Sequence, residues 1–185
     1  MRIAVMGTGG VGGCFGAKLA RAGHDVAFVA RGAHLAAMRA KGLRIESAAG
    51  EIVLPRVVAT DDPASLAPVD VVMFCVKLWD TEGAARQLKP IVGPGTRVIP
   101  FQNGVESIER LRKFFPQEAV MGGSAYIASR ISRPGVIEHI GQMQRLQFGP
   151  LLAEQRPVAE RPSDIGPKAS SKAAQVGVAL VTVAA

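Results

Sequence analysis

The stretch RIAVMGTGGVG, residues 2–12, decides the fold of this chain. Its first half, Arg2–Met6, is a short apolar run and predicts a buried strand. Its second half, residues 7–12, is a G-x-G-x-x-G sequence. Apolar residues then recur at helical spacing as far as residue 22, where Gly23 stops the pattern. The stretch therefore predicts a strand that turns tightly, through glycines, into a helix.

A glycine-rich turn in this position matches the way proteins cradle a dinucleotide. Gly7 permits the tight turn, Gly9 lets a pyrophosphate approach the backbone, and Gly12 lets helix and strand pack closely. The phosphates then lie on the free N–H groups of the helix N-terminus. A glycine turn without a ligand is the alternative, but the strand before it and the helix after it favour binding. We expect cofactor contacts from the whole turn: Gly7, Thr8, Gly9, Gly10, Val11 and Gly12.

The order of the following elements predicts the fold class. A second strand at residues 25–30 and a helix at 34–40 give a βαβ unit with a right-handed crossover. The pattern continues with a hairpin at 43–47 and 51–54, strands 69–76 and 97–101, helices 81–88 and 105–115, and strands 119–129, 135–140 and 145–148. We expect the strand 69–76 at the centre of the sheet. The prediction is an α/β protein of the Rossmann type, with a doubly wound, mostly parallel sheet and a β-rich C-terminal edge.

The end of the second strand indicates which dinucleotide is bound. NAD-binding domains place Asp or Glu there to hold the ribose 2′-hydroxyl. This chain has no carboxylate at that end, since Asp25 stands at the other end of the strand, and it has Arg31 instead. A guanidinium offers a fork of donors that suits a 2′-phosphate, although an ordinary surface arginine is the alternative. We therefore expect NADP(H) as the cofactor.

Polar residues follow two further strands at the same edge of the sheet. Lys77 comes directly after the strand 69–76, and Gln102, Asn103 and Gly104 come directly after 97–101. Taken alone, each feature has a structural alternative: a lysine side chain that extends to solvent, and an Asn-Gly pair that only forms a turn. Ligands of open α/β sheets lie off the carboxyl ends of the strands, so we expect these residues to line a cleft.

The composition, with 48% hydrophobic and 20% charged residues, is that of a globular domain. The net charge is +7, but the basic residues form no cluster with aromatics, so we expect no nucleic-acid partner. Cys14 and Cys75 lie in apolar segments and are predicted to be buried free thiols. We find no signal peptide and no membrane-spanning run, which predicts a cytoplasmic protein. His24, His34 and His139 lack metal-ligand spacing, so no metal is expected.

Over residues 1–150 the chain resembles the ketopantoate reductase (2-dehydropantoate 2-reductase) family. The resemblance rests on the glycine turn, Arg31, the Val-Lys pair ending at Lys77, and the stretches QNGVE (residues 102–106) and PGVIEH (residues 134–139). It implies NADPH-dependent reduction of ketopantoate to pantoate, in pantothenate and coenzyme A biosynthesis. It implies cofactor contacts from Arg31, Lys77, Asn103 and Ala128, with Asn103 also touching the substrate. It also implies a homodimer for the full-length form.

The resemblance implies that the general acid is a lysine of a second, helical domain. Residues 151–185 read as a linker and an aberrant start of that domain, so we expect most of the domain to be missing. Lys172 stands at about the right offset for the acid, but Pro167 interrupts the expected helix and Ser170 replaces a family tryptophan. Without the second wall of the cleft, we expect little or no turnover by this chain alone.

Two other functions remain open on the sequence. One is a non-catalytic NADPH-binding module that senses the cofactor for a partner. The other is an NADP-linked dehydrogenase of a different 2-keto or 2-hydroxy acid.

Overall fold

Five parallel strands form the central sheet of the computed structural model, which describes residues 1–151 and 179–181. Their order in space is β5-β2-β1-β6-β7. The chain therefore adds strands to one side of β1 and then crosses to the other side, which places the switch point of the sheet between β1 and β6. The strands are β1 (Arg2–Met6), β2 (Asp25–Val29), β5 (Val58–Thr60), β6 (Val71–Phe74) and β7 (Arg97–Pro100).

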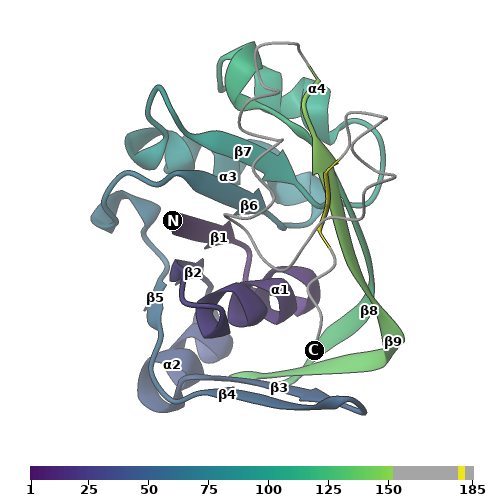
Figure 1. The fold of residues 1–185 in the computed structure, drawn as a ribbon. Coiled ribbons are helices and arrows are strands. Elements are labelled where there is room, and N and C mark those ends of the chain that lie inside the picture. Colours follow the sequence, from purple (N-terminus) through teal and green to yellow (C-terminus); the bar gives the residue numbers. More distant parts are fainter. Residues whose placement is uncertain (152–178, 182–185) are drawn as a thin grey trace.

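Helices cover both faces of this sheet (Figure 1). On β1, Ile3 and Val5 pack in the apolar cluster that includes the first helix, whereas Ala4 and Met6 pack in the cluster of the third and fourth helices. Successive strand residues point to opposite faces, so a strand covered on both sides reads as a continuous apolar run. The helices are α1 (Gly10–Arg21), α2 (Gly32–Lys41), α3 (Thr81–Leu88) and α4 (Ser107–Arg112), with short 3-10 turns η1 (Pro63–Ser65), η2 (Leu78–Asp80), η3 (Lys89–Ile91) and η4 (Gln117–Ala119).

A second, mixed sheet lies against α1 on the side away from the first (Figure 1). In it β9 pairs with β8 and β10 in antiparallel fashion and with β3 in parallel, and β3 pairs with β4. Helix α1 contacts strands of both sheets, so it is the shared layer between them. The strands are β3 (Leu43–Ser47), β4 (Gly50–Leu54), β8 (Gly122–Arg133), β9 (Val136–Gly149) and β10 (Ala179–Val181).

The predicted fold class is confirmed, and four details of the prediction are wrong. The β-rich end forms this separate sheet rather than an edge of the first, and the expected strands 135–140 and 145–148 are one strand, β9. Residue 141 is a glycine at φ +77°, and residues 141–143 bulge out of the pairing, which breaks the periodicity but not the strand. Strand β6 is shorter than expected and lies beside the central β1, and α4 is a short helix of 107–112.

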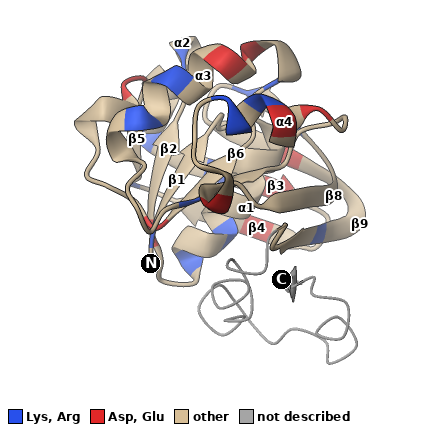
Figure 2. Ribbon diagram, turned by 90° about the horizontal axis from the view of Figure 1, so that it is seen from above, with Lys and Arg blue, Asp and Glu red and all other residues tan. Residues whose placement is uncertain are grey.

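Basic and acidic residues alternate along much of the ribbon and gather in no single-sign region of this view (Figure 2). Several basic residues are paired with neighbouring carboxylates, for example Arg133 with Glu46 at 2.6 Å and Arg130 with Glu138 at 2.8 Å. No helix in the described part of the chain is long and apolar enough to span a membrane.

Both cysteines are free thiols, as predicted. Cys14 is fully buried, and Cys75 is partly buried at the end of β6. Burial raises the pKa of Cys14 to about 11, against the opposing effect of Lys18, and raises that of Cys75 to about 12. At neutral pH both groups are therefore protonated.

The turn between β8 and β9 is tied to helix α2 by one histidine. The Gly135 N–H donates to Nδ1 of the buried His34 at 3.0 Å, and the Gly135 carbonyl accepts from the Arg44 N–H of β3. Nδ1 accepts only when it carries no proton, so the contact fixes the tautomer with the proton on Nε2. Burial lowers the pKa of His34, and a hydrogen bond to the Thr8 backbone partly offsets this.

The lowered pKa of His34 makes the fold sensitive to acid. The folded state binds this proton less well than the unfolded state, so the stabilisation is present above the ordinary histidine pKa and is lost as the pH falls below it. We expect the wild type to lose more free energy of unfolding than His34→Asn between about pH 7.5 and about pH 5.5, measured by urea denaturation. Asparagine retains an acceptor without a titrating ring. Parallel losses in the two proteins would contradict this role.

Close packing at two glycines sets the distance between α1 and the first sheet. A Cβ built on Gly12 would overlap the Gly7 carbonyl and stand 2.8 Å from Val5 Cγ1. A Cβ on Gly16 would stand 2.6 Å from the Phe28 ring. The helix therefore lies closer to β1 than side chains would permit.

Substituting glycines in two helices should have opposite effects on stability. Gly12→Ala forces the helix off backbone atoms, and we expect it to lower the free energy of unfolding by about 2 kcal/mol or more. Gly83, in α3, has no atom within 4 Å of an added Cβ, so Gly83→Ala should raise it by about 0.5–1 kcal/mol. Thermal and urea unfolding measure both. A tolerated Gly12→Ala would show that the helix does not depend on this approach.

Candidate functional site

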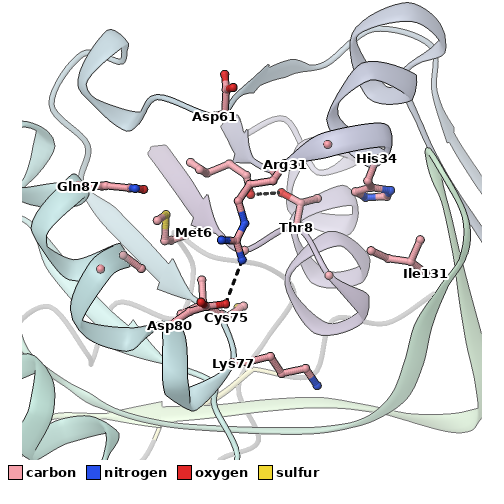
Figure 3. Close-up of a pocket in the computed structure, with 18 of the residues that line it drawn as sticks. Met6, Thr8, Arg31, His34, Asp61, Cys75, Lys77, Asp80, Gln87 and Ile131 are labelled. Carbon is pink, nitrogen blue, oxygen red and sulfur yellow. Dashed lines mark hydrogen bonds and ion pairs between the residues drawn. The ribbon is translucent and has the colours of Figure 1, made fainter.

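A cavity of about 710 Å³ opens at the carboxyl ends of β1, β2 and β6 (Figure 3). This is the edge where the strand order switches direction, which is where open α/β sheets bind their ligands. Its lining residues come from the glycine turn, from the starts of α2 and α3, and from the second sheet: Met6, Gly7, Thr8, Gly9, Val29, Ala30, Arg31, Gly32, His34, Asp61, Cys75, Val76, Lys77, Trp79, Asp80, Gly83, Ala84, Gln87 and Ile131.

The floor of the cavity is the turn from β1 into α1. Gly7 has φ +96° and lies against the backbone of Cys75 and Val76, where a side chain has no room. The N–H groups of Gly7 and Thr8 both donate to the Val29 carbonyl, at 3.2 and 2.9 Å, and the Thr8 hydroxyl donates to the same oxygen at 3.0 Å. These bonds within the protein hold the turn on β2.

The N-terminus of α1 is open to the cavity. Gly9 is the N-cap, no side chain caps the helix, and no acidic residue lies in its first turn. The first intrahelical bond runs from the Gly13 N–H to the Gly9 carbonyl at 2.9 Å, so the amides of residues 10–12 precede the helical ladder. A Cβ on Gly9 would meet no atom within 4 Å. Free N–H groups, the helix dipole and open space together suit a phosphate.

Arg31 stands where the sequence analysis placed it, directly after β2. Its backbone is extended and forms the N-cap of α2, and its guanidinium reaches across the cavity to Asp80 of η2 (Figure 3). The Arg31 Nη2 and Asp80 Oδ2 atoms are 3.0 Å apart. The arginine side chain is 78% exposed, so its remaining donors are accessible from solvent.

Lys77 and the Gln-Asn turn meet at the ends of β6 and β7. Lys77 lines the cavity, and its side chain extends away from Arg31 (Figure 3). The Gln102 Nε2 donates to the Val76 carbonyl and to the Thr81 hydroxyl, each at 2.9 Å, which joins the two strand ends. Asn103 is exposed on this joined turn but is outside the cavity lining.

The other expected cofactor residues lie around the cavity rather than in it. Gly10 packs against the Ser129 carbonyl of β8, Val11 packs on the core, and Gly12 packs on the Gly7 carbonyl. Ala128 was expected at a strand end, but β8 continues to residue 133, so Ala128 is exposed in mid-strand at a register shift. That detail of the prediction is wrong, because β8 continues to pair with β9 as far as Arg133.

Several residues that complete the cavity were not predicted from the sequence. Trp79 and Asp80 stand two and three residues after Lys77, so their place in the chain was a usable signal. Asp61, which follows β5, had the same kind of signal, but β5 itself was not predicted. His34 stands three residues after Arg31, at the start of α2, so its place in the chain was also a usable signal. Ile131 reaches the cavity through the folding of the second sheet, which no local pattern reveals. Lys172 and the rest of the segment 152–178 lie outside the described residues.

Comparisons with known proteins agree with this geometry. The model of the family described as ketopantoate reductase PanE/ApbA matches residues 3–153. A 2-dehydropantoate 2-reductase from Nostoc sp. is 34% identical over 139 residues, which cover 75% of this chain and 43% of the relative. The uncharacterized oxidoreductase YkpB of Bacillus subtilis is 31% identical over 80% of this chain and 48% of its own length.

Solved structures give the same result. The crystal structure of 2-dehydropantoate 2-reductase from Geobacter metallireducens superposes with a TM-score of 0.83 at 31% identity, over 89% of this chain and 54% of that one. The enzyme of the same name from Porphyromonas gingivalis superposes with a TM-score of 0.78 at 36% identity, over 86% and 60%. The chain thus spans about half the length of the curated relatives it matches. Because the family model covers most of the chain, the protein belongs to the ketopantoate reductase family.

Proposed function

We propose that the described residues form the NADP(H)-binding domain, residues 1–150, of an oxidoreductase that reduces 2-dehydropantoate to pantoate. The observation that carries the proposal is the cavity itself, where an uncapped helix N-terminus and an arginine at the end of β2 share one wall. The reaction class is supported by the family and by relatives named 2-dehydropantoate 2-reductase.

The residues present fit a dinucleotide of this kind. Open space over Gly9 and the free amides of residues 10–12 accommodate a pyrophosphate. Arg31, one strand away, supplies a planar fork for a 2′-phosphate on the adenosine ribose. We assign Lys77, Asn103 and the Ala128 backbone to the other end of the cofactor.

The chemistry divides between cofactor and protein. A bound reduced nicotinamide supplies the hydride for the carbonyl carbon. The residues of this chain hold the dinucleotide on the α1 amides and fix its orientation against β1 and β6. Asn103 would hold the substrate carbonyl, and we retain Lys172 as the candidate proton donor for the developing alkoxide.

Equilibrium titration tests the cofactor part of the proposal. Trp79 is the single tryptophan of the chain and lines the cavity. A bound reduced nicotinamide should therefore quench its emission by energy transfer. Because little turnover is expected of this chain alone, binding of ketopantoate to the NADPH-loaded chain, compared with smaller and larger 2-keto acids, tests the substrate. Stronger binding of another 2-keto acid would reassign the substrate, and absence of NADPH binding would refute the proposal.

Removing the Arg31 guanidinium should discriminate between the two dinucleotides. We expect Arg31→Met to weaken NADPH binding about ten- to hundredfold, because the 2′-phosphate loses its cation while Asp80 remains nearby. NADH binding should change less than about threefold, since it has no 2′-phosphate. Arg110→Met removes the same charge from α4, outside the cavity, and is the control. Equal losses for both dinucleotides would contradict this role of Arg31.

Filling the space over Gly9 should block the phosphates and leave the fold intact. Gly9 has φ −84°, which alanine adopts, and the added methyl meets no atom of the described residues within 4 Å. We expect Gly9→Ala to change the free energy of unfolding by less than about 1 kcal/mol, because two effects oppose each other. Alanine is a poorer N-cap, which destabilises the folded state, but it also lowers the conformational entropy of the unfolded chain. We expect NADPH affinity to fall at least about tenfold. Unchanged affinity would place the pyrophosphate elsewhere.

A further inference from the structure

An ion pair spans the cavity where we place the adenosine ribose. Arg31 follows β2, and Asp80 ends the short turn η2 that follows β6. Both residues line the cavity, and the Arg31 Nη2 and Asp80 Oδ2 atoms are 3.0 Å apart (Figure 3). The sequence analysis found no carboxylate at the end of β2, but the fold brings one to that place from the neighbouring crossover.

Asp80 is held in position by the turn that carries it. The Asp80 N–H donates to the Lys77 carbonyl at 2.9 Å, and the Thr81 hydroxyl donates to the Leu78 carbonyl at 2.7 Å. Gln102 in turn donates to the Thr81 hydroxyl, which anchors η2 on the end of β7. These hydrogen bonds fix the position of the Asp80 carboxylate in the cavity wall.

Among the described residues, two carboxylates line the cavity, those of Asp61 and Asp80, and only Asp80 forms an ion pair with Arg31. Asp61 pairs with Arg39 of α2 at 3.1 Å, and Arg39 also donates to the Ala59 carbonyl. In Figure 3 Asp61 lies on the opposite side of Arg31 from Asp80 and carries no contact to it. Asp80 is thus the negative charge that a group bound to the Arg31 guanidinium would meet.

The two dinucleotides meet this pair differently at the ribose 2′ position. A 2′-phosphate that takes the free donors of Arg31 brings a second anion to the guanidinium that already holds Asp80, and the two anions repel each other. A 2′-hydroxyl donates a hydrogen bond to a carboxylate and leaves the ion pair intact. The arginine therefore favours one cofactor, and the aspartate favours the other.

We propose that Asp80 is a selectivity-determining residue: it lowers the affinity for NADP(H) relative to NAD(H), so that the site accepts both dinucleotides. This inference rests on the proposed dinucleotide site. It assigns opposite effects to the two partners of one ion pair, since loss of Arg31 should reduce NADP selectivity and loss of the Asp80 charge should increase it.

The test is the selectivity ratio of Asp80→Asn, with Glu82→Gln as its matched control. Glu82 lies two residues after Asp80, at the start of α3, and its substitution changes the net charge by the same amount. It is exposed, pairs with Arg86 and is outside the cavity lining. Calorimetric titration gives the dissociation constants of NADP⁺ and NAD⁺, and of 2′,5′-ADP and 5′-AMP as probes of the adenosine half alone. The thermal unfolding of each variant confirms that it is folded.

We expect the ratio of the NAD⁺ to the NADP⁺ dissociation constant to rise about three- to tenfold in Asp80→Asn, and the adenosine probes to show the same rise. In Glu82→Gln the ratio should change less than about twofold. The effect of Asp80→Asn should shrink as salt is raised from about 0.02 M to about 0.5 M, because salt screens exposed charges.

Two results would overturn the inference while the proposed function stands. One is a ratio in Asp80→Asn equal to that in Glu82→Gln. The other is a lower ratio, which would mean that Asp80 orients Arg31 for the 2′-phosphate rather than opposing it. Absence of binding of every dinucleotide to the folded wild type would instead refute the proposed site, and the inference with it.

Discussion

The close approach of helix α1 to strand β1 is the constraint on which the rest of the molecule depends. Gly7 turns the chain at a positive φ, and Gly12 lies on the carbonyl of Gly7 with no room for a methyl group. This approach buries one face of α1 on the first sheet and directs its uncapped N-terminus into the cavity. The same helix then supports the second sheet on its other side. One local packing requirement thereby fixes both the layer order and the place of the proposed phosphate site.

The second sheet is more than a cover for α1. It places Ser129 against Gly10 at the start of the helix, Ile131 in the cavity wall, and Gly135 on the ring of His34. These contacts restrain the glycine turn from the side that the Rossmann strands do not reach. A restrained site loses less conformational freedom when a ligand binds, so we expect the second sheet to raise the affinity of the proposed dinucleotide site.

Features set by neighbouring residues could be predicted, and those set by distant pairings could not. The glycine turn and the position of Arg31 follow from a strand and its next few residues, and the structure has both in the expected places. The parallel pairing of β3 with β9 joins segments about ninety residues apart, and no sequence period encodes it. The long pairing of β8 with β9, which leaves Ala128 at a register shift in mid-strand, likewise has no local signal in the sequence. The position of Asp80, three residues after Lys77, was a usable signal, but its ion pair with Arg31 joins two crossovers and has no local signal.

We propose above all that the amides at the start of α1 hold the phosphates of a dinucleotide. An NMR titration of the ¹⁵N-labelled chain with NADPH tests it most directly, because each backbone N–H reports separately. The account predicts that the largest shifts fall on residues 9–12, with a second group at Arg31 and its neighbours in α2. Shifts confined to the second sheet or to α4, with the α1 amides unmoved at saturation, would contradict it.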